Sequence, residues 1–192
     1  MTENTFLIVG LGNPGREYKD NRHNVGFMLV DRLSVRLDAR MSRVQARALV
    51  GSVNYEGNKI ILAKPQTYMN LSGQSIQGLA RFYKLPLENV IVAHDDLDLP
   101  FGTIRIRPGG GPGGQRGVAS AIERLGTKDF RRLRIGIGRP PGRMDPAAYV
   151  LQDFSKADLS LLSEVLDHAA DAALEFILNG LNAAMNKFNG EV

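Results

Sequence analysis

The chain of 192 residues carries 24 lysine and arginine residues against 20 aspartate and glutamate residues, a formal net charge of +4, and 43% of its residues are hydrophobic. This length and composition are typical of one globular domain, expected over residues 1–192. Because the chain contains no cysteine, disulfides, thiolate nucleophiles and cysteine-ligated metals are excluded. No apolar run approaches the roughly 18 residues of a membrane span, and the start of the chain lacks the pattern of a secretion signal. We therefore expect a cytoplasmic protein that does not enter a membrane.

Strands and helices alternate along the sequence. Short apolar runs bounded by turn residues or charges predict strands over residues 6–9, 44–55, 59–63, 90–93 and 133–137. Apolar residues at helical spacing predict helices over residues 25–38, 72–83 and 115–125. The segment from Gly109 to Gly114 is too rich in glycine for regular structure and predicts a loop.

A long amphipathic helix is expected near the C-terminus. Ser155 and Asp158 form a capping-box pattern ahead of it. Its apolar stripe is expected to consist of Leu159, Leu162, Leu166, Ala169, Ala173, Phe176 and Ile177. Strands that alternate with helices predict an α/β fold, here a single-domain three-layer sandwich with a mixed, largely parallel sheet flanked by helices.

The glycine-rich turn after the first strand has two interpretations. Gly10, Gly12 and Gly15 match the pattern G-x-G-x-x-G, in which a helix N-terminus binds a dinucleotide pyrophosphate. However, polar residues follow the turn before helical periodicity resumes, and no acidic residue ends a second strand about 20 positions on. The alternative is that the turn displays Asn13 at the carboxyl edge of the sheet, where its amide both donates and accepts hydrogen bonds. Taken alone, Asn13 is better explained as a turn residue that tolerates positive φ.

The candidate general bases near neutral pH are three histidines, His23, His94 and His168. His23 lies in a polar loop between a cation and an amide, which suits catalysis. His94 lies inside an apolar strand and is expected to be structural. His168 is expected on a solvated face of the C-terminal helix.

Acidic residues follow the strand that contains His94. Asp95 lies at its carboxyl end, where a carboxylate can fix the tautomer of an imidazole and raise its basicity. Asp96 and Asp98 are alternatives for that role. The acidic run also permits a metal site, but no histidine spacing supports one.

Two further groups of polar residues have open interpretations. Asn70 or Ser72 is a candidate N-cap of the helix that follows, and Asn70 is equally a candidate for holding water or a carbonyl group in a cleft. A dense group of cations predicts a phosphate-binding face about as strongly as a solvated one. Its members are Arg105, Arg107, Arg116, Lys128, Arg131, Arg132, Arg134, Arg139 and Arg143.

Five segments taken together resemble bacterial peptidyl-tRNA hydrolases. They are GLGNPGREYKDNRHNVGF, KPQTYMNLSG, VAHDDLDLPFG, the glycine loop and RLRIGIGRP. The resemblance covers nearly the whole chain in order, and the joint occurrence of the segments is far more specific than any one of them. It implies a monomeric enzyme without metal or cofactor that cleaves the ester bond between a peptide and the 3′ end of tRNA. The implied partners are peptidyl-tRNA and the stalled large ribosomal subunit.

The resemblance also implies roles for single residues. His23 is implied as the general base, Asp95 as its orienting carboxylate, and Asn13 as the group that recognises the first peptide amide. The residues implied to line the substrate cleft are Tyr18, Tyr68 and Asn70, of which Asn70 also positions water or the carbonyl. The residues implied to clamp the tRNA 5′-phosphate are Arg107 and Arg134.

One pair of residues departs from the pattern of the family. Histidine and asparagine usually follow the glycine loop, whereas this chain has Gln115 and Arg116, and Pro112 likewise replaces a histidine. Arginine only donates hydrogen bonds, so it cannot reproduce both roles of an asparagine. We expect Arg116 to contact the terminal adenosine or a phosphate instead.

This departure leaves a second function class open, a catalytically silent RNA-binding protein like the splicing factor of plant organelles that is related to the family. Asn13, His23, Asn70 and Asp95 occur together in this chain. RNA binding alone does not need this combination, so it favours hydrolysis.

Overall fold

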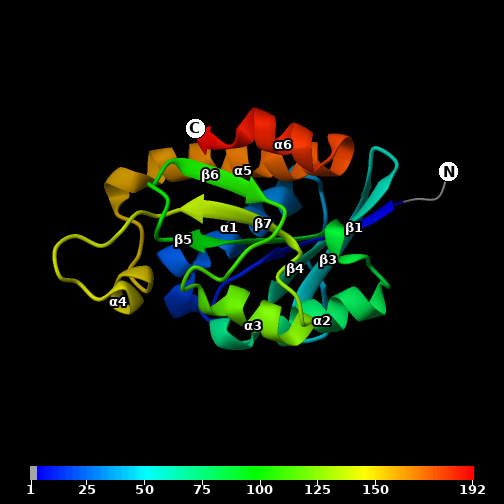
Figure 1. Cartoon of the computed structure of the whole chain (residues 1–192), viewed down its shortest axis with the longest axis horizontal. Coiled ribbons are helices and arrows are strands. Elements are labelled where there is room, and N and C mark those ends of the chain that lie inside the picture. The colour runs from blue at the N-terminus through cyan, green and yellow to red at the C-terminus, as the bar shows by residue number, and fades with distance from the viewer. Residues whose placement is uncertain (1–3) are drawn as a thin grey trace.

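The computed structural model describes residues 4–192, which form one eight-stranded sheet between two layers of helices (Figure 1). The order of the strands across the sheet is β2-β3-β4-β1-β5-β7-β6-β8. Their bounds are β1 (Asn4–Gly10), β2 (Arg43–Gln45), β3 (Ala48–Tyr55), β4 (Asn58–Pro65), β5 (Val90–Asp96), β6 (Thr103–Arg107), β7 (Arg131–Gly136) and β8 (Gly190–Glu191). The predicted three-layer α/β fold with a mixed sheet is confirmed.

Six α-helices and five short 3₁₀ helices connect the strands. The α-helices are α1 (Val25–Arg36), α2 (Ser72–Phe82), α3 (Arg116–Leu125), α4 (Pro146–Val150), α5 (Leu159–Asn179) and α6 (Leu181–Phe188). The 3₁₀ helices are η1 (Arg16–Tyr18), η2 (Arg22–Asn24), η3 (Met69–Leu71), η4 (Leu87–Asn89) and η5 (Lys156–Asp158). None of the helices within residues 4–192 is long and apolar enough to cross a membrane.

The parallel strands lie at the centre of the sheet. β1 pairs in parallel with β4 and with β5, and β5 pairs in parallel with β7, while the outer strands on both sides pair antiparallel. The carboxyl ends of parallel strands meet at one edge, where open α/β sheets form their sites. Asn13 follows β1 and Asp95 lies near the end of β5, so the topology brings these two residues to the same edge.

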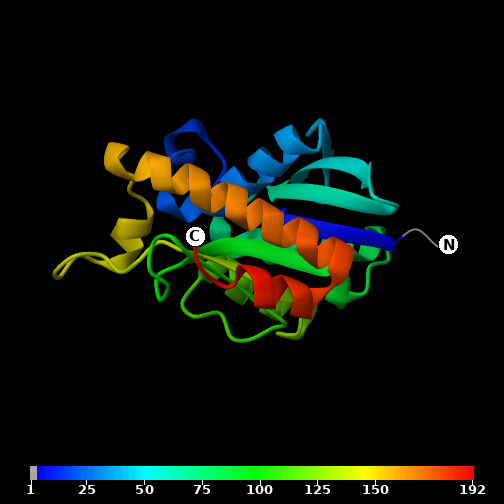
Figure 2. The ribbon, with the colours of Figure 1, turned by 90° about the horizontal axis from the view of Figure 1, so that it is seen from above.

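A separate apolar core covers each face of the sheet. α1, α5 and α6 pack on one face, and α2 and α3 pack on the other. Seen from above, α5 and α6 lie across the sheet (Figure 2). The approach of α1 to β1 is very close, since a Cβ on Gly10 would lie 2.0 Å from the carbonyl oxygen of Gly26. α1 begins at Val25, well beyond Gly15, so the glycine pattern serves backbone packing and not a dinucleotide turn.

The structure corrects several predicted elements. Residues 44–55 are two strands, β2 and β3, because Ala46 and Arg47 adopt positive φ angles of 49° and 61° and form a tight turn. The capping box of Ser155 and Asp158 is present, but it begins η5 ahead of α5. Leu159 is 53% exposed and does not belong to the apolar stripe of α5. β6, β8, α4 and α6 were not predicted.

Candidate active site

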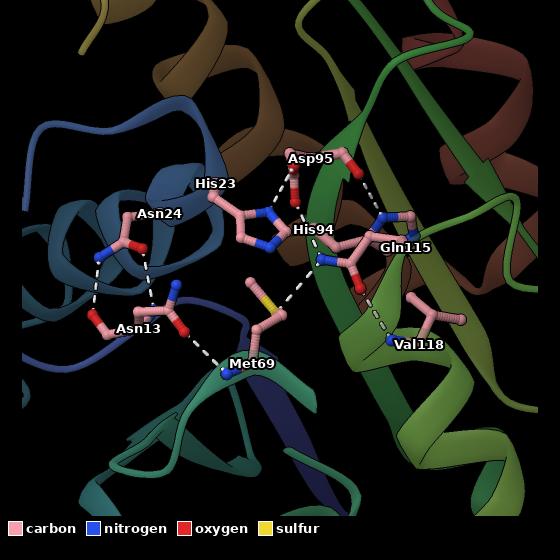
Figure 3. A network of polar contacts seen from close by, with 8 residues as sticks. All are labelled: Asn13, His23, Asn24, Met69, His94, Asp95, Gln115 and Val118. Atoms are coloured by element: carbon pink, nitrogen blue, oxygen red, sulfur yellow. Dashed lines mark hydrogen bonds and ion pairs between the residues drawn. The ribbon is translucent and has the colours of Figure 1, made fainter. Parts of the chain in front are cut away.

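The centre of the site is a hydrogen bond between the side chains of His23 and Asp95. Nδ1 of His23, presented by η2, lies 2.8 Å from Oδ2 of Asp95 (Figure 3). The carboxylate is 3% exposed and the imidazole 12%. An ionised carboxylate only accepts hydrogen bonds, so Nδ1 carries the proton and Nε2 keeps its lone pair. The arrangement is that of a general base with an orienting acid.

The two alternative acids are bound to other partners. Oδ2 of Asp96 accepts a hydrogen bond from Nε of Arg134 at 2.7 Å. Asp98 forms an ion pair with Arg139 at the surface. Of the three acids, therefore, only Asp95 is hydrogen-bonded to His23.

Asn13 is held rigidly by its neighbours. Its backbone N–H donates to Oδ1 of Asn24 and its carbonyl accepts from Nδ2 of Asn24, both at 2.9 Å. Oδ1 of Asn13 accepts from the backbone N–H of Met69 at 2.8 Å. Oδ1 has a second lone pair, so Asn13 offers a ligand an acceptor as well as the donor Nδ2.

Gln115 lies behind Asp95 and is buried. Its Nε2 donates to Oδ1 of Asp95 at 2.9 Å, and its Oε1 accepts from the backbone N–H of Val118 at 2.8 Å (Figure 3). It is thus the N-cap of α3. The sequence predicted Gln115 as the first residue of a helix and as a departure from the family pattern, whereas the structure begins α3 at Arg116. Glutamine is not among the usual N-cap residues, so the sequence gives no local signal for this capping role.

These side chains border a cleft of about 510 Å³. Tyr68, Asn70 and Arg116 all line it and are exposed, Tyr68 with 61% of its surface. Neither Asn70 nor Ser72 caps α2, because η3 precedes that helix and the hydroxyl of Ser72 donates to the carbonyl of Met69. Tyr18, half-buried in η1, does not belong to the lining.

One wall of the cleft consists of residues that sequence reasoning missed. They come from α4 and its flanks and are Asp145, Pro146, Ala147, Val150 and Leu151. Asp145 caps α4 by accepting from the backbone N–H of Ala147. A capping acid followed by proline is a helix-start signal, so the sequence does contain the information for this element.

Only some of the cations in the predicted basic face are accessible to a phosphate. Because Arg105 lies opposite Arg134, and Arg107 opposite Arg132, on the antiparallel strands β6 and β7, all four side chains start from one face of the sheet. Arg107 is exposed and Arg134 is half-buried. Arg132, however, is buried and has a structural role.

Arg132 holds the glycine loop in place. Its guanidinium donates to the carbonyl oxygens of Gly110, Gly111 and Lys128 and lies 4.0 Å from the centre of the Phe130 ring. Burial, assisted by nearby Arg134, lowers the pKa of Arg132 to about 10. The side chain therefore remains charged at neutral pH and is not free to bind phosphate.

The other two histidines make structural contacts. Nδ1 of His94 donates to the carbonyl oxygen of Asp95 at 2.8 Å, and burial lowers the pKa of His94, which keeps it neutral. Nε2 of His168 lies 3.0 Å from the carbonyl oxygen of Phe188 and links α5 to α6. His168 is half-buried, so its expected place on a solvated face was wrong.

Within the described residues, no three histidine, aspartate or glutamate side chains are grouped so that they could hold a metal ion. The polar side chains that line the cleft include the imidazole of His23, the guanidinium of Arg116, the amides of Asn13, Asn70 and Gln115, and the carboxylates of Asp95, Asp96 and Asp145. They can activate water, hold a carbonyl oxygen and bind phosphate.

The chain is similar to known proteins over nearly its whole length. The model of the family described as peptidyl-tRNA hydrolase matches residues 7–192. The peptidyl-tRNA hydrolase of Rhodococcus jostii is 50% identical over 190 residues, which are 98% of this chain and 100% of the relative. That of Pseudarthrobacter chlorophenolicus is 49% identical, over 98% of this chain and 97% of the relative. The crystal structure of peptidyl-tRNA hydrolase from Acinetobacter baumannii has a TM-score of 0.92 at 36% identity and covers 100% of this chain and 97% of its own.

Proposed function

The chain belongs to the peptidyl-tRNA hydrolase family, and we propose that it cleaves the ester bond between peptide and tRNA by attack of a water molecule that His23 activates. Hydrolysis of peptidyl-tRNA is the activity of the family, and it recycles the tRNA. The observation that carries the proposed mechanism is the bond between His23 Nδ1 and Asp95 Oδ2, which leaves Nε2 as a base at the cleft.

In the first step, Nε2 of His23 takes a proton from water while the water oxygen attacks the ester carbonyl carbon. The imidazolium is stabilised by Asp95. The bond from that carbon to the ribose 3′-oxygen then breaks, and the leaving oxygen takes the proton back from His23. Free peptide and tRNA result, and the enzyme is regenerated. General-base assistance of this kind contributes about 10²- to 10⁴-fold.

Amide donors complete the site. The amide of Asn13 is held through Oδ1 by the backbone N–H of Met69, and its Nδ2 is suited to hold a carbonyl oxygen. The second lone pair of Oδ1 is suited to accept from the first peptide N–H, which is the recognition that the family resemblance implies. Asn70 lies on the same cleft and is a second donor. One such donor is worth about 3 kcal/mol when charge develops on the oxygen.

The tRNA is bound outside the cleft by phosphate contacts. Arg107 and Arg134 start from the same face of β6 and β7, which suits the tRNA 5′-phosphate. Phosphate contacts position a nucleic acid without reading its sequence, which fits an enzyme that acts on many tRNAs. Tyr68 is 61% exposed and offers a ring on which a base or a peptide group can pack.

We further infer a monomeric, cytoplasmic protein that acts on peptidyl-tRNA released from the ribosome or held by its stalled large subunit. The residues of the proposed mechanism all come from one chain, so catalysis does not require a second copy. The lack of cysteine fits a reducing compartment. A catalytically silent RNA-binding role is not favoured, because the paired and buried His23 and Asp95 would have no use there.

Release of labelled N-acetyl-aminoacyl groups from tRNA tests the mechanism. His23→Ala is expected to lower kcat by at least about 100-fold, because the base is lost. His168→Gln is the matched control, since His168 contacts only the C-terminal helix region, and it is expected to keep kcat. Full activity of His23→Ala would exclude His23 as the base, and unblocked aminoacyl-tRNA serves as the substrate control.

A further inference from the structure

We propose that Gln115 is a positioning residue for catalysis, a role that rests on the proposed function of His23 and Asp95. Gln115 lines the cleft, and its side chain is hydrogen-bonded to Asp95, Met69 and Val118. It binds the oxygen of Asp95 that His23 leaves free. The carboxylate is therefore held from two sides, by the imidazole through Oδ2 and by the glutamine amide through Oδ1.

The orientation of the Gln115 amide is fixed by chemistry. The backbone N–H of Val118 can only donate, so the atom of Gln115 that lies 2.8 Å from it must be the oxygen. The NH₂ group must then face Asp95, where it lies 2.9 Å from Oδ1. A second contact of Nε2, with Sδ of Met69 at 3.3 Å, lies on the same side. No flipped amide satisfies both ends.

Gln115 therefore connects the catalytic pair to the start of α3. Hydrogen-bond donors offset the cost of burying a carboxylate, and a carboxylate bonded through both oxygens cannot rotate freely. The backbone gives a third restraint, because His94 donates to the carbonyl of the same Asp95. The carboxylate of Asp95, which accepts from His23, is therefore oriented by its contacts with α3 and by its own strand, β5.

The hydrogen bond to Asp95 comes from a glutamine in this chain, which distinguishes it from the usual bacterial pattern. The usual bacterial pattern has a histidine at this position, and histidine changes its charge near neutral pH. Glutamine has no titratable proton, so the donor to Asp95 is the same at every working pH. We infer that the acid limb of the rate profile is free of any ionisation at position 115.

Gln115 has two roles, the N-cap of α3 and the donor to Asp95. A substitution that keeps the N-cap and removes the donor separates them. Serine is among the best N-cap residues but is too short to reach Asp95. Gln115→Ser is expected to lower kcat by about 10-fold, equal to about 1.4 kcal/mol, with KM changed less than about twofold. Gln77→Ser is the matched control, because Gln77 binds the carbonyl of Arg124 at the far end of α3. It is expected to keep kcat.

A double mutant with Asp95→Asn tests whether Gln115 affects kcat through Asp95. In the Asp95→Asn background, Gln115→Ser is expected to lower kcat by less than about twofold, because residues that act as a unit are not additive. A further tenfold loss in that background overturns the proposal, as does a single Gln115→Ser variant with full kcat.

Charge at position 115 gives a second readout. Gln115→Glu keeps the acceptor for Val118 but places a second carboxyl group against Asp95, and two carboxyl groups about 3 Å apart share one proton. With that proton present the glutamic acid donates to Asp95 as Gln115 does, and once the proton is lost at higher pH the donor is lost as well. The kcat of Gln115→Glu is therefore expected to fall by about tenfold relative to the parent as the pH rises through this ionisation, and a kcat profile parallel to that of the parent contradicts the proposal. If His23→Ala is itself active, the general base is wrong. If His23→Ala is inactive and Gln115→Ser fully active, only the role of Gln115 is wrong.

Discussion

At the scale of single residues, Arg116 is a cation in an unfavourable place. It is the first residue of α3 and lines the cleft, so its charge lies near the positive end of a helix dipole. Among residues 4–192 no acidic side chain forms an ion pair with it. A charge held in this way is suited to meet an anionic ligand, here a phosphate near the 3′ end of the tRNA.

We therefore expect Arg116→Ala to raise KM at low salt and to make KM less dependent on salt. One phosphate contact accounts for about one unit of the logarithmic salt slope. Because a cation leaves the helix N-terminus, the free protein is expected to gain up to about 0.5 kcal/mol of stability. KM measured at a series of KCl concentrations, together with urea unfolding, checks both parts. Parallel salt slopes for parent and variant contradict the phosphate contact.

Residue chemistry made part of the site predictable. Asn13, His23 and Asp95 stand out because few side chains in this chain can serve as bases or amide donors near strand ends. Residue chemistry alone left the choice among Asp95, Asp96 and Asp98 open, because neighbouring residues at a strand end point to different sides, and the family resemblance implied Asp95. Long-range partners decide it, since Arg134 and Arg139 bind the other two acids. Such partners lie about 40 positions away in the chain and leave no local signal.

At the scale of elements, the loop that carries His23 is joined to the segment around α4. The guanidinium of Arg22 lies 4.2 Å from the centre of the Tyr149 ring, and its backbone N–H donates to the carbonyl of Gln152 at 3.1 Å. Asn21 donates to Asp153 at 2.6 Å. The α4 wall of the cleft and the loop that carries His23, the proposed base, are thus joined by direct contacts.

Loss of this contact is expected to loosen both elements. Arg22→Ala removes the stacked guanidinium, and Arg22→Lys keeps the charge without the planar stacking. Both variants are expected to lower kcat by about threefold to tenfold, because misplacement of a catalytic group is costly. Trypsin is expected to cut faster after exposed Arg143, which limited proteolysis measures. Parent-like kcat and cleavage rates in Arg22→Ala exclude this coupling.

The elements that the sequence did not reveal are short or at the edge. α4 has five residues and β8 two, too few for a periodic pattern. The turn between β2 and β3 uses Ala46 and Arg47 at positive φ, where asparagine or glycine is the usual signal. By contrast, the central strands and α1, α2, α3 and α5 carry long apolar patterns, because each is buried by the sheet or by a helix layer.

At the scale of the whole molecule, His94 couples folding stability to pH. It is buried in the central strand β5, and desolvation lowers its pKa from 6.5, against the opposing effects of its bond to Asp95 and of the charges on Asp95 and Asp96. Below pH 6.5 the unfolded chain therefore binds a proton at this histidine that the folded chain does not. Stability falls as the pH decreases through this range, until the folded protein is protonated as well.

The expected loss from His94 is at most about 1.4 kcal/mol per pH unit. Urea unfolding at about pH 7 and about pH 5 measures the total loss, to which paired carboxylates also contribute. His94→Gln is expected to be less stable than the parent at pH 7 but to lose less stability on acidification. His168→Gln, in the half-buried contact between α5 and α6, serves as the reference for a histidine outside the sheet. An equal loss of stability in the parent and in His94→Gln would mean that acid sensitivity resides in the carboxylates, and that protonation of His94 in β5 does not affect folding stability.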